Sequence, residues 1–200
     1  MRRSTLESAT RERLIRAAVT VFASRGYHRA TVDDIVVASE ASKGTFYYYF
    51  ASKQAIFLEL LEQMAAAVEA GVDHVIEHEV GALAKIEAAL RVVMGVASEN
   101  RDLTKILLIE SAALGAEFER SRLHIHQRFA ALIQRHLDGA VLDGAIPPQD
   151  TRTAAAAWIG AINEVATQQL AVDGDLTGLL PSLRMLLLRS IGARSRDETA

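Results

Sequence analysis

The chain has 200 residues, 50% of them hydrophobic, which is enough to bury a core in one or two domains. It contains no cysteine, so disulfides, thiolate metal sites and cysteine nucleophiles are excluded. The net charge is −3, but residues 1–53 carry nine Lys and Arg against five acidic side chains. This asymmetry indicates a phosphate-contacting head on an acidic body, although chance explains it equally well unless a motif supports it.

No stretch approaches the ~18 apolar residues that a membrane-spanning helix needs. The apolar segment from Ala17 to Ala23 is short and lies between two arginines, which indicates an amphipathic helix and not a signal peptide. We therefore expect a cytoplasmic protein without a membrane partner.

Apolar residues at helical spacing continue through the whole chain, which has three prolines and no strand-like alternation. We predict an all-α fold of about nine helices. The first runs from about Glu7 to Ser24, with Gly26 as its stop, and two short helices follow within residues 31–50. A long helix begins at Lys53, and the later helices are predicted over residues 83–97, 103–114, 117–142, 154–172 and 179–191.

The most informative segment is TVDDIVVASEASKGTFYYYFASK, residues 31–53. Thr31 and Ser42 are each placed to cap a short helix, because a side-chain oxygen there accepts from a free backbone N–H of the first turn. Apolar residues at helical spacing predict a seam between the two helices, namely Ile35, Ala38, Phe46 and Phe50. A short helix that is braced in this way and presents Lys, Thr and Tyr outward fits the major groove of DNA, so we predict a helix-turn-helix.

The candidate DNA contacts cluster at the start of the second helix of this motif. Its N-terminal end would approach base edges with Ser42, Lys43, Gly44, Thr45 and Tyr47. The predicted phosphate contacts are Thr31, Tyr48 and Lys53. Helix N-termini favour anions, which supports Thr31 and Lys53 in this role. The alternatives are a packing role for the tyrosines and a solvated surface position for Lys53.

The segment from Leu14 to Leu61 resembles the DNA-binding domain of TetR-family transcriptional regulators. The matching positions, all in register, are Ala17, Ala18, Phe22, Gly26, Tyr27, Thr31, Asp34, Ile35, Ser42, Gly44, Thr45, Tyr47, Phe50 and Lys53. The resemblance implies DNA contacts at Thr31, Lys43, Gly44, Tyr47, Tyr48 and Lys53. One position departs, because most members have Gly where this chain has Glu40, so we expect a strained or differently closed turn.

The resemblance implies a domain organisation and a mechanism. Residues 1–53 would form the DNA-binding domain, residues 54–194 a ligand-binding and dimerisation domain, and residues 195–200 a disordered tail. A dimeric repressor of this kind binds a near-palindromic operator and is released when a small hydrophobic effector tilts the long fourth helix. The alternatives left open are an activator, or a regulator that senses a drug-like or aromatic ligand.

The last two predicted helices are apolar on more than one side, which indicates burial at a subunit interface. The resemblance implies the same, because TetR-family proteins dimerise through a four-helix bundle of these helices. The predicted interface residues are Trp158, Ala161, Val165, Leu183 and Leu187. The alternative is that both helices pack on the core of their own chain.

An effector cavity is predicted in the body, where polar residues interrupt apolar helices at Glu110, Ser111 and Asn163. The predicted apolar lining is Met64, Leu90, Met94, Leu107, Leu114, Phe118 and Phe129, which would suit a dry core equally well. The segment WIGAINEVATQQLAVDGDL resembles regulators of fatty-acid metabolism in the same family, several of which respond to long-chain acyl-CoA. That resemblance makes acyl-CoA a candidate effector.

Catalytic and metal signatures are missing from the sequence. It has no Glu-x-x-His pair, HExxH motif, Gly-x-Ser-x-Gly elbow or phosphate-binding Gly-rich loop, so we do not expect an enzyme or a cofactor. His74 and His78 have a spacing that can chelate zinc, but a third ligand would have to come from a distant histidine. We therefore predict no metal site.

Overall fold

The computed structural model describes residues 2–110 and 114–193. The predicted all-α class is confirmed, since the described part of the chain forms nine α-helices and no strand. The helices are α1 (Arg2–Arg29), α2 (Val32–Ala38), α3 (Lys43–Tyr49), α4 (Lys53–His78), α5 (Ala82–Glu99), α6 (Arg101–Lys105), α7 (Ala116–Leu142), α8 (Thr151–Ala171) and α9 (Leu180–Ser190). The predicted tail, residues 195–200, and Ser111 lie outside the described residues.

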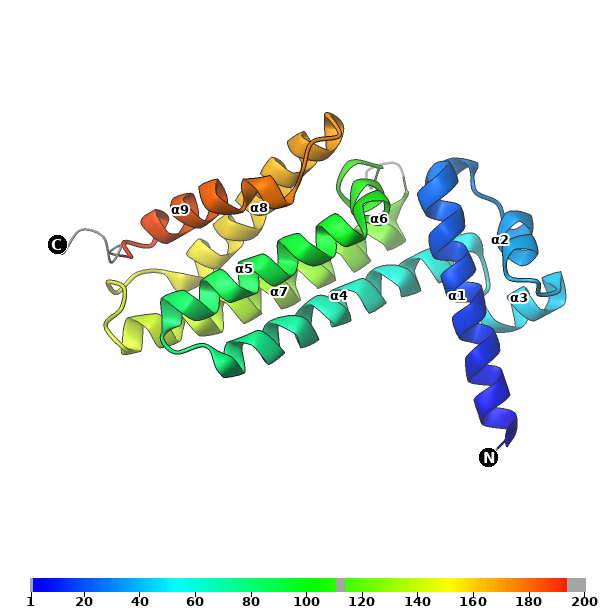
Figure 1. The fold of residues 1–200 in the computed structure, drawn as a ribbon, viewed down its shortest axis with the longest axis horizontal. Helices are drawn as coiled ribbons and strands as arrows, with labels where there is room; N and C mark the ends of the chain where they lie inside the picture. Colours follow the sequence, from blue (N-terminus) through cyan, green and yellow to red (C-terminus); the bar gives the residue numbers. More distant parts are fainter. Residues whose placement is uncertain (1, 111–113, 194–200) are drawn as a thin grey trace.

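Two units are joined by α4 (Figure 1). The head consists of α1, α2 and α3 at one end of the molecule, and α4 runs from it along the body. In the body α4, α5 and α7 pack against one another, while α8 packs on α7 and α9 on α5. No helix of the described residues is long and apolar enough to cross a membrane.

The head has a compact apolar core in which three of the four predicted seam residues, Ile35, Phe46 and Phe50, are buried. Ala38 is exposed, because it lies in the last turn of α2, where Ser39 faces the core in its place. Leu14, Phe22, Ile35 and Phe46 are all fully buried. The chain passes Gly26 at φ 71°, a conformation that glycine adopts without strain, and continues as one further helical turn to Arg29. The first helix therefore bends at Gly26, where we had predicted that it would stop.

Aromatic rings connect the head to the body. The rings of Phe57 and Phe118 stack with centroids 5.9 Å apart, and Phe22 meets Phe57 edge-on at 5.1 Å. Leu103 and Ile106 are buried in the same cluster, which places the α6 region directly against the head. The contact between the head and the start of α6 and α7 is therefore apolar and continuous.

The segment after α6 departs from the prediction. We predicted one helix over residues 103–114, but α6 ends at Lys105 and a π-helical turn follows over Ile106–Glu110. Such turns are rare and are frequently found at functional sites. Here the π-helical turn lies between the head and a cavity in the body.

Candidate DNA-binding surface and effector cavity

The N-terminus of α3 is fixed by its own cap. Ser42 Oγ accepts from the backbone N–H of Thr45 at 3.0 Å and lies 2.8 Å from Thr45 Oγ1. Phe46 anchors the helix in the head core. Lys43, Gly44, Tyr47 and Tyr48 consequently lie on the solvent side, with Tyr48 71% exposed. A short helix with this exposed face has the geometry that enters a major groove.

Lys43 is exposed and bound to a carboxylate. Its Nζ lies 2.8 Å from Asp33 Oδ1, and this hydrogen bond to Asp33 raises the pKa of Lys43. The ion pair joins α3 to the first turn of α2 and leaves the ammonium charged. A surface pair of this kind is weak, so Lys43 can exchange Asp33 for a DNA acceptor.

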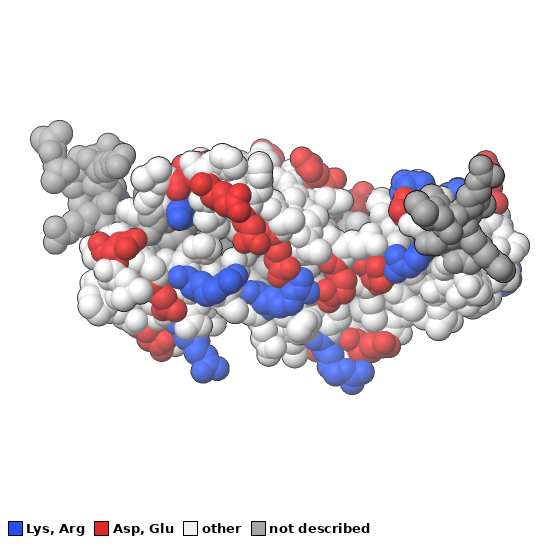
Figure 2. Space-filling view, turned by 90° about the horizontal axis from the view of Figure 1, so that it is seen from below, with Lys and Arg blue, Asp and Glu red and all other residues white. Residues whose placement is uncertain are grey.

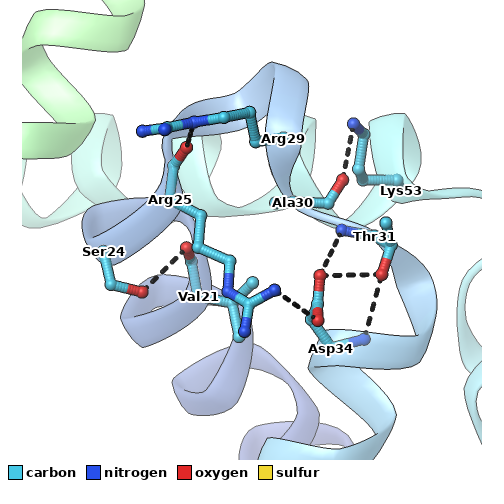
Figure 3. Close-up of polar contacts among 8 residues, drawn as sticks. All are labelled: Val21, Ser24, Arg25, Arg29, Ala30, Thr31, Asp34 and Lys53. Atoms are coloured by element: carbon cyan, nitrogen blue, oxygen red, sulfur yellow. Dashed lines mark hydrogen bonds and ion pairs between the residues drawn. The ribbon is translucent and has the colours of Figure 1, made fainter.

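Thr31 caps α2 in a reciprocal arrangement (Figure 3). Asp34 donates its backbone N–H to Thr31 Oγ1 at 3.2 Å, while Asp34 Oδ2 accepts from the backbone N–H of Thr31 at 2.9 Å. The Thr31 hydroxyl also donates to Asp34 Oδ2 at 2.7 Å, and this bond, followed by the one from the Thr31 backbone N–H, lowers the pKa of Asp34. Arg25 adds an ion pair of 2.7 Å. The start of α2 is therefore preorganised next to the turn that precedes it.

The ammonium group of Lys53, a predicted phosphate contact, is hydrogen-bonded within the protein. Its Nζ donates to the backbone carbonyl oxygens of Tyr27 at 2.7 Å and Ala30 at 2.9 Å, the second of which is drawn in Figure 3. The ammonium also lies 4.3 Å from the centre of the Tyr27 ring. Burial lowers the pKa of Lys53. The side chain thus satisfies carbonyl groups at the end of α1, which is the structural role that sequence reasoning missed.

The body encloses an apolar cavity of about 170 Å³ between α4, α5, α7 and α8. Six of the predicted lining residues border it, namely Met64, Leu90, Met94, Leu107, Phe129 and Asn163. Two others, Leu114 and Phe118, belong instead to the cluster between head and body, because the start of α7 lies against Phe57 of α4. The side chain of Glu110 lies outside the described residues.

Polar side chains border the cavity at two places. Asn163 Nδ2 lies 3.1 Å from His126 Nε2, and His126 Nδ1 lies 3.3 Å from Arg122 Nη1. Burial, followed by the charge of Arg122, lowers the pKa of His126. Lys85 and His136 border the cavity elsewhere, and neither they nor His126 were predicted from the sequence as cavity residues. Only their tertiary position distinguishes these residues from solvated side chains of amphipathic helices.

A second, more open groove of about 550 Å³ lies outside the Asn163–His126 pair, between α7 and α8. It is lined in part by Arg122, Gln127, Gly160 and Glu164. The pair borders both spaces, so it forms part of the wall between the apolar cavity and this more open groove.

Three of the predicted interface residues are buried within the chain itself. Trp158 and Leu187 border the cavity, Leu183 is 2% exposed, and Trp158 Nε1 donates to Ser190 Oγ at 3.0 Å. Their faces of α8 and α9 point inward, which sequence periodicity could not show because both helices are apolar on several sides. The outward faces carry Ala156, Ala157, Gly160, Met185 and Leu186, while Ala161 and Val165 are half-buried.

His74 and His78 are both exposed on α4. His78 Nδ1 lies 2.8 Å from the carbonyl oxygen of His74, which occupies one ring nitrogen. Within residues 2–110 and 114–193, no group of three or more His, Asp or Glu side chains is placed to hold a metal ion.

The comparisons with known proteins cover both units of the chain. A family model described as "Bacterial regulatory proteins, tetR family" matches residues 14–60, and one described as "Tetracyclin repressor-like, C-terminal domain" matches residues 79–167. The chain belongs to the TetR family. It is therefore a DNA-binding transcriptional regulator and not an enzyme.

Relatives within the TetR family differ in how much of the chain they match. The Bacillus subtilis regulator YdgC is 34% identical over 103 residues, which is 48% of this chain and 52% of YdgC. The fatty acid metabolism regulator protein of B. subtilis is 24% identical over 188 residues, 89% of this chain and 93% of that protein. A crystal structure of B. subtilis FadR in complex with stearoyl-CoA aligns with a TM-score of 0.79 at 26% identity, covering 88% of this chain and 96% of that one.

Proposed function

We propose that the protein is a homodimeric repressor that binds a near-palindromic operator and leaves it when a hydrophobic effector, in the first place a long-chain acyl-CoA, fills the body cavity. Each head would present α3 to a major groove, with the two α3 helices about 34–36 Å apart on adjacent turns of the duplex. The cytoplasm is the corresponding location. The proposal keeps the predicted contacts at Thr31, Ser42, Lys43, Gly44, Thr45, Tyr47 and Tyr48, and assigns Lys53 to the support of α1.

The observation that carries the proposal is the position of the π-helical turn. Leu107 and Leu108 border the cavity, while the neighbouring Ile106 and Leu103 are buried against the head. An effector that enlarges the cavity displaces the first pair and thereby moves the second. Because packed cores shift between discrete arrangements, a small displacement here changes the position of the head.

The long helix α4 provides a second connection between cavity and head. Met64, Val68 and Val72 border the cavity, and Ile56 and Phe57 on the same helix are buried in the head core. Arg128 of α7 holds α4 from outside the cavity, with hydrogen bonds of 2.9 Å to Glu69 and 2.6 Å to Glu62. A change in the packing of α7 on α4 therefore reorients the helix that carries the head.

The outward faces of α8 and α9 would form the dimer interface. Small residues on α8, Ala156, Ala157 and Gly160, allow close approach of a second helix, and Met185 and Leu186 on α9 are about half exposed. Two-fold packing of these faces would bury apolar surface that a monomer leaves in water. A dimer also supplies the two heads that a near-palindromic operator requires.

Acyl-CoA is the leading effector because the cavity is lined mainly by aliphatic side chains and because the FadR structure of similar fold contains stearoyl-CoA. Trp158 and Phe129 also border the cavity, so an aromatic ligand is the second candidate. Either would act by preferring the form of the dimer that cannot span the operator. To reverse a 99:1 equilibrium the preference must reach about 5.5 kcal/mol.

The test is fluorescence anisotropy of a labelled duplex from the region upstream of the gene. Protein is titrated first, then stearoyl-CoA, with free CoA and a planar aromatic dye as parallel additions. We expect salt-sensitive binding that stearoyl-CoA reverses and free CoA leaves intact. Binding that stearoyl-CoA does not reverse would remove it as the effector, and release by the dye alone would favour the aromatic class.

A further inference from the structure

The polar residues that border the body cavity lie at its two ends. Thr104, His126 and Asn163 lie near the head, and Lys85 and His136 lie toward the far end of the body. His126 and His136 are ten positions apart on α7, which corresponds to about 15 Å along the helix. The wall between the two ends consists mainly of aliphatic side chains.

At the end near the head, the polar groups have partners within the protein. Thr104 Oγ1 donates to the carbonyl oxygens of Asn100 at 3.0 Å and Ala97 at 3.2 Å. Asn163 and His126 lie 3.1 Å apart, as described above. This end therefore presents little hydrogen-bonding capacity to a ligand, and no unpaired charge.

At the far end, the polar groups lack such partners. Within the described residues, the side chains of Lys85 and His136 make no hydrogen bond or ion pair, although both are only partly exposed. Burial, with the positive charges of Arg135 and Lys85, lowers the pKa of His136, while Asp73 of α4 acts in the opposite direction. Lys85 and Arg135 thus act on His136 with two positive charges, against the one carboxylate of Asp73.

We propose that Lys85 and His136 bind the anionic end of an amphipathic effector, whose apolar chain extends along the cavity toward Thr104 and His126. The assignment rests on the proposed function, in which this cavity is the effector site. The apolar stem of Lys85 can line the cavity wall while its ammonium reaches the anion. A charge-assisted hydrogen bond in a partly desolvated place is stronger than one in water, which makes the contact selective.

The same chemistry fits two sources of negative charge. A free fatty acid ends in a carboxylate, whereas an acyl-CoA carries phosphates beyond its thioester. Calorimetric titrations with dodecanoate, dodecanoyl-CoA and uncharged 1-dodecanol separate the two, because all three share the chain. The variants are Lys85→Met, which removes only the charge, Lys85→Arg, which retains it, and Lys105→Met as a matched control on α6.

We expect Lys85→Met to weaken binding of one anionic ligand about tenfold or more. The variant should bind 1-dodecanol as the natural protein does. Lys85→Arg should retain most of the anion affinity, and Lys105→Met should change none of the three. The anion that loses affinity identifies the source of the charge.

Two outcomes overturn the assignment in distinguishable ways. If Lys85→Met binds both anions with unchanged affinity, or loses 1-dodecanol equally, Lys85 does not recognise an anionic end, while the cavity remains the effector site. If the natural protein binds none of the three ligands, the proposed lipid-responsive function fails together with the assignment. Thermal unfolding of each variant establishes that lost affinity does not come from lost folding.

Discussion

At the scale of single residues, Gly44 is the position at which DNA contact and folding can be separated. It lies in the first turn of α3 and is exposed, and an added Cβ would meet only Ser42 Oγ at 3.7 Å, an ordinary contact. The fold therefore does not require glycine here. A backbone that must approach DNA closely does require it.

We predict that Gly44→Ala lowers operator affinity about tenfold, comparable to the loss of a good base contact. The same change should stabilise the protein by up to about 1 kcal/mol, because alanine is the better helix former. Gly139→Ala in α7, where a Cβ meets nothing within 4 Å, is the matched control and should leave DNA binding unchanged. Anisotropy and urea denaturation give both quantities. Unchanged affinity in Gly44→Ala would show that DNA does not approach this turn.

Lys53 is a second such residue. Support of the α1 carbonyl groups and contact with a DNA phosphate predict different results when it is replaced. Lys53→Met keeps the stem but leaves the carbonyl groups of Tyr27 and Ala30 without their donor. We predict a loss of about 2 kcal/mol in the free energy of unfolding. The slope of log affinity against log salt should remain that of the natural protein. A slope reduced by about one, without lost stability, would instead assign Lys53 to a DNA phosphate.

At the scale of elements, the turn between α2 and α3 contains a residue in the left-handed region. Glu40 has φ 52°, and its neighbour Ala41 donates its backbone N–H to the carbonyl oxygen of Val36 at 3.2 Å. The turn thus keeps the geometry for which glycine is suited, and the side chain of Glu40 adds strain. The turn is therefore strained, as expected, and the strain lies in the backbone conformation of Glu40.

We predict that Glu40→Gly raises the free energy of unfolding by about 1 kcal/mol, since the left-handed conformation costs other residues roughly that amount. The unfolding temperature should rise by about 2–4 °C for a chain of this size. Glu40→Ala, which removes the carboxylate but keeps the Cβ, separates charge from strain. Equal stabilisation by both substitutions would show that the carboxylate, and not the backbone, is unfavourable.

The helices could be predicted from sequence because caps and apolar spacing are local signals. Thr31 and Ser42 cap the helices that their side chains indicate, and Ile35, Phe46 and Phe50 are buried in the expected seam, which Ala38 does not join. The π-helical turn at Ile106–Glu110 was missed, because its apolar sequence is equally compatible with an α-helix. Trp158 and Lys85 were missed as cavity residues since tertiary packing decides which side of an apolar helix faces inward.

At the scale of the whole molecule, the first 53 residues carry an excess of basic side chains and the rest an excess of acidic ones. The basic side chains nevertheless do not form a broad basic surface. On the face seen in Figure 2, basic and acidic side chains alternate along the body. Several cations are paired with carboxylates, such as Arg128 with Glu62 and Arg11 with Glu59 at 2.9 Å. This distribution does not fit non-specific binding of nucleic acid along the body, so DNA contact depends on the two heads of a dimer.

Gly160 tests the dimer. It is exposed in the middle of α8, where an added Cβ would meet nothing within the chain. We predict that Gly160→Glu produces a folded monomer whose operator affinity falls by at least about a hundredfold. The reason is that a monomer binds the operator with one head, without the second head that a dimer holds next to its half-site. Light scattering after size exclusion gives the mass, and helical circular dichroism should be unchanged. A dimeric Gly160→Glu protein would place the interface elsewhere.

The central claim is that effector binding in the body cavity and operator binding by the heads weaken each other. Linkage requires that the effector lowers operator affinity by the same factor by which the operator lowers effector affinity. We would therefore measure stearoyl-CoA binding by calorimetry, first to the free protein and then to the protein saturated with operator DNA. We expect affinity for stearoyl-CoA to fall about 5- to 150-fold on DNA, matching the factor from anisotropy. Equal affinity with and without operator would contradict the coupling.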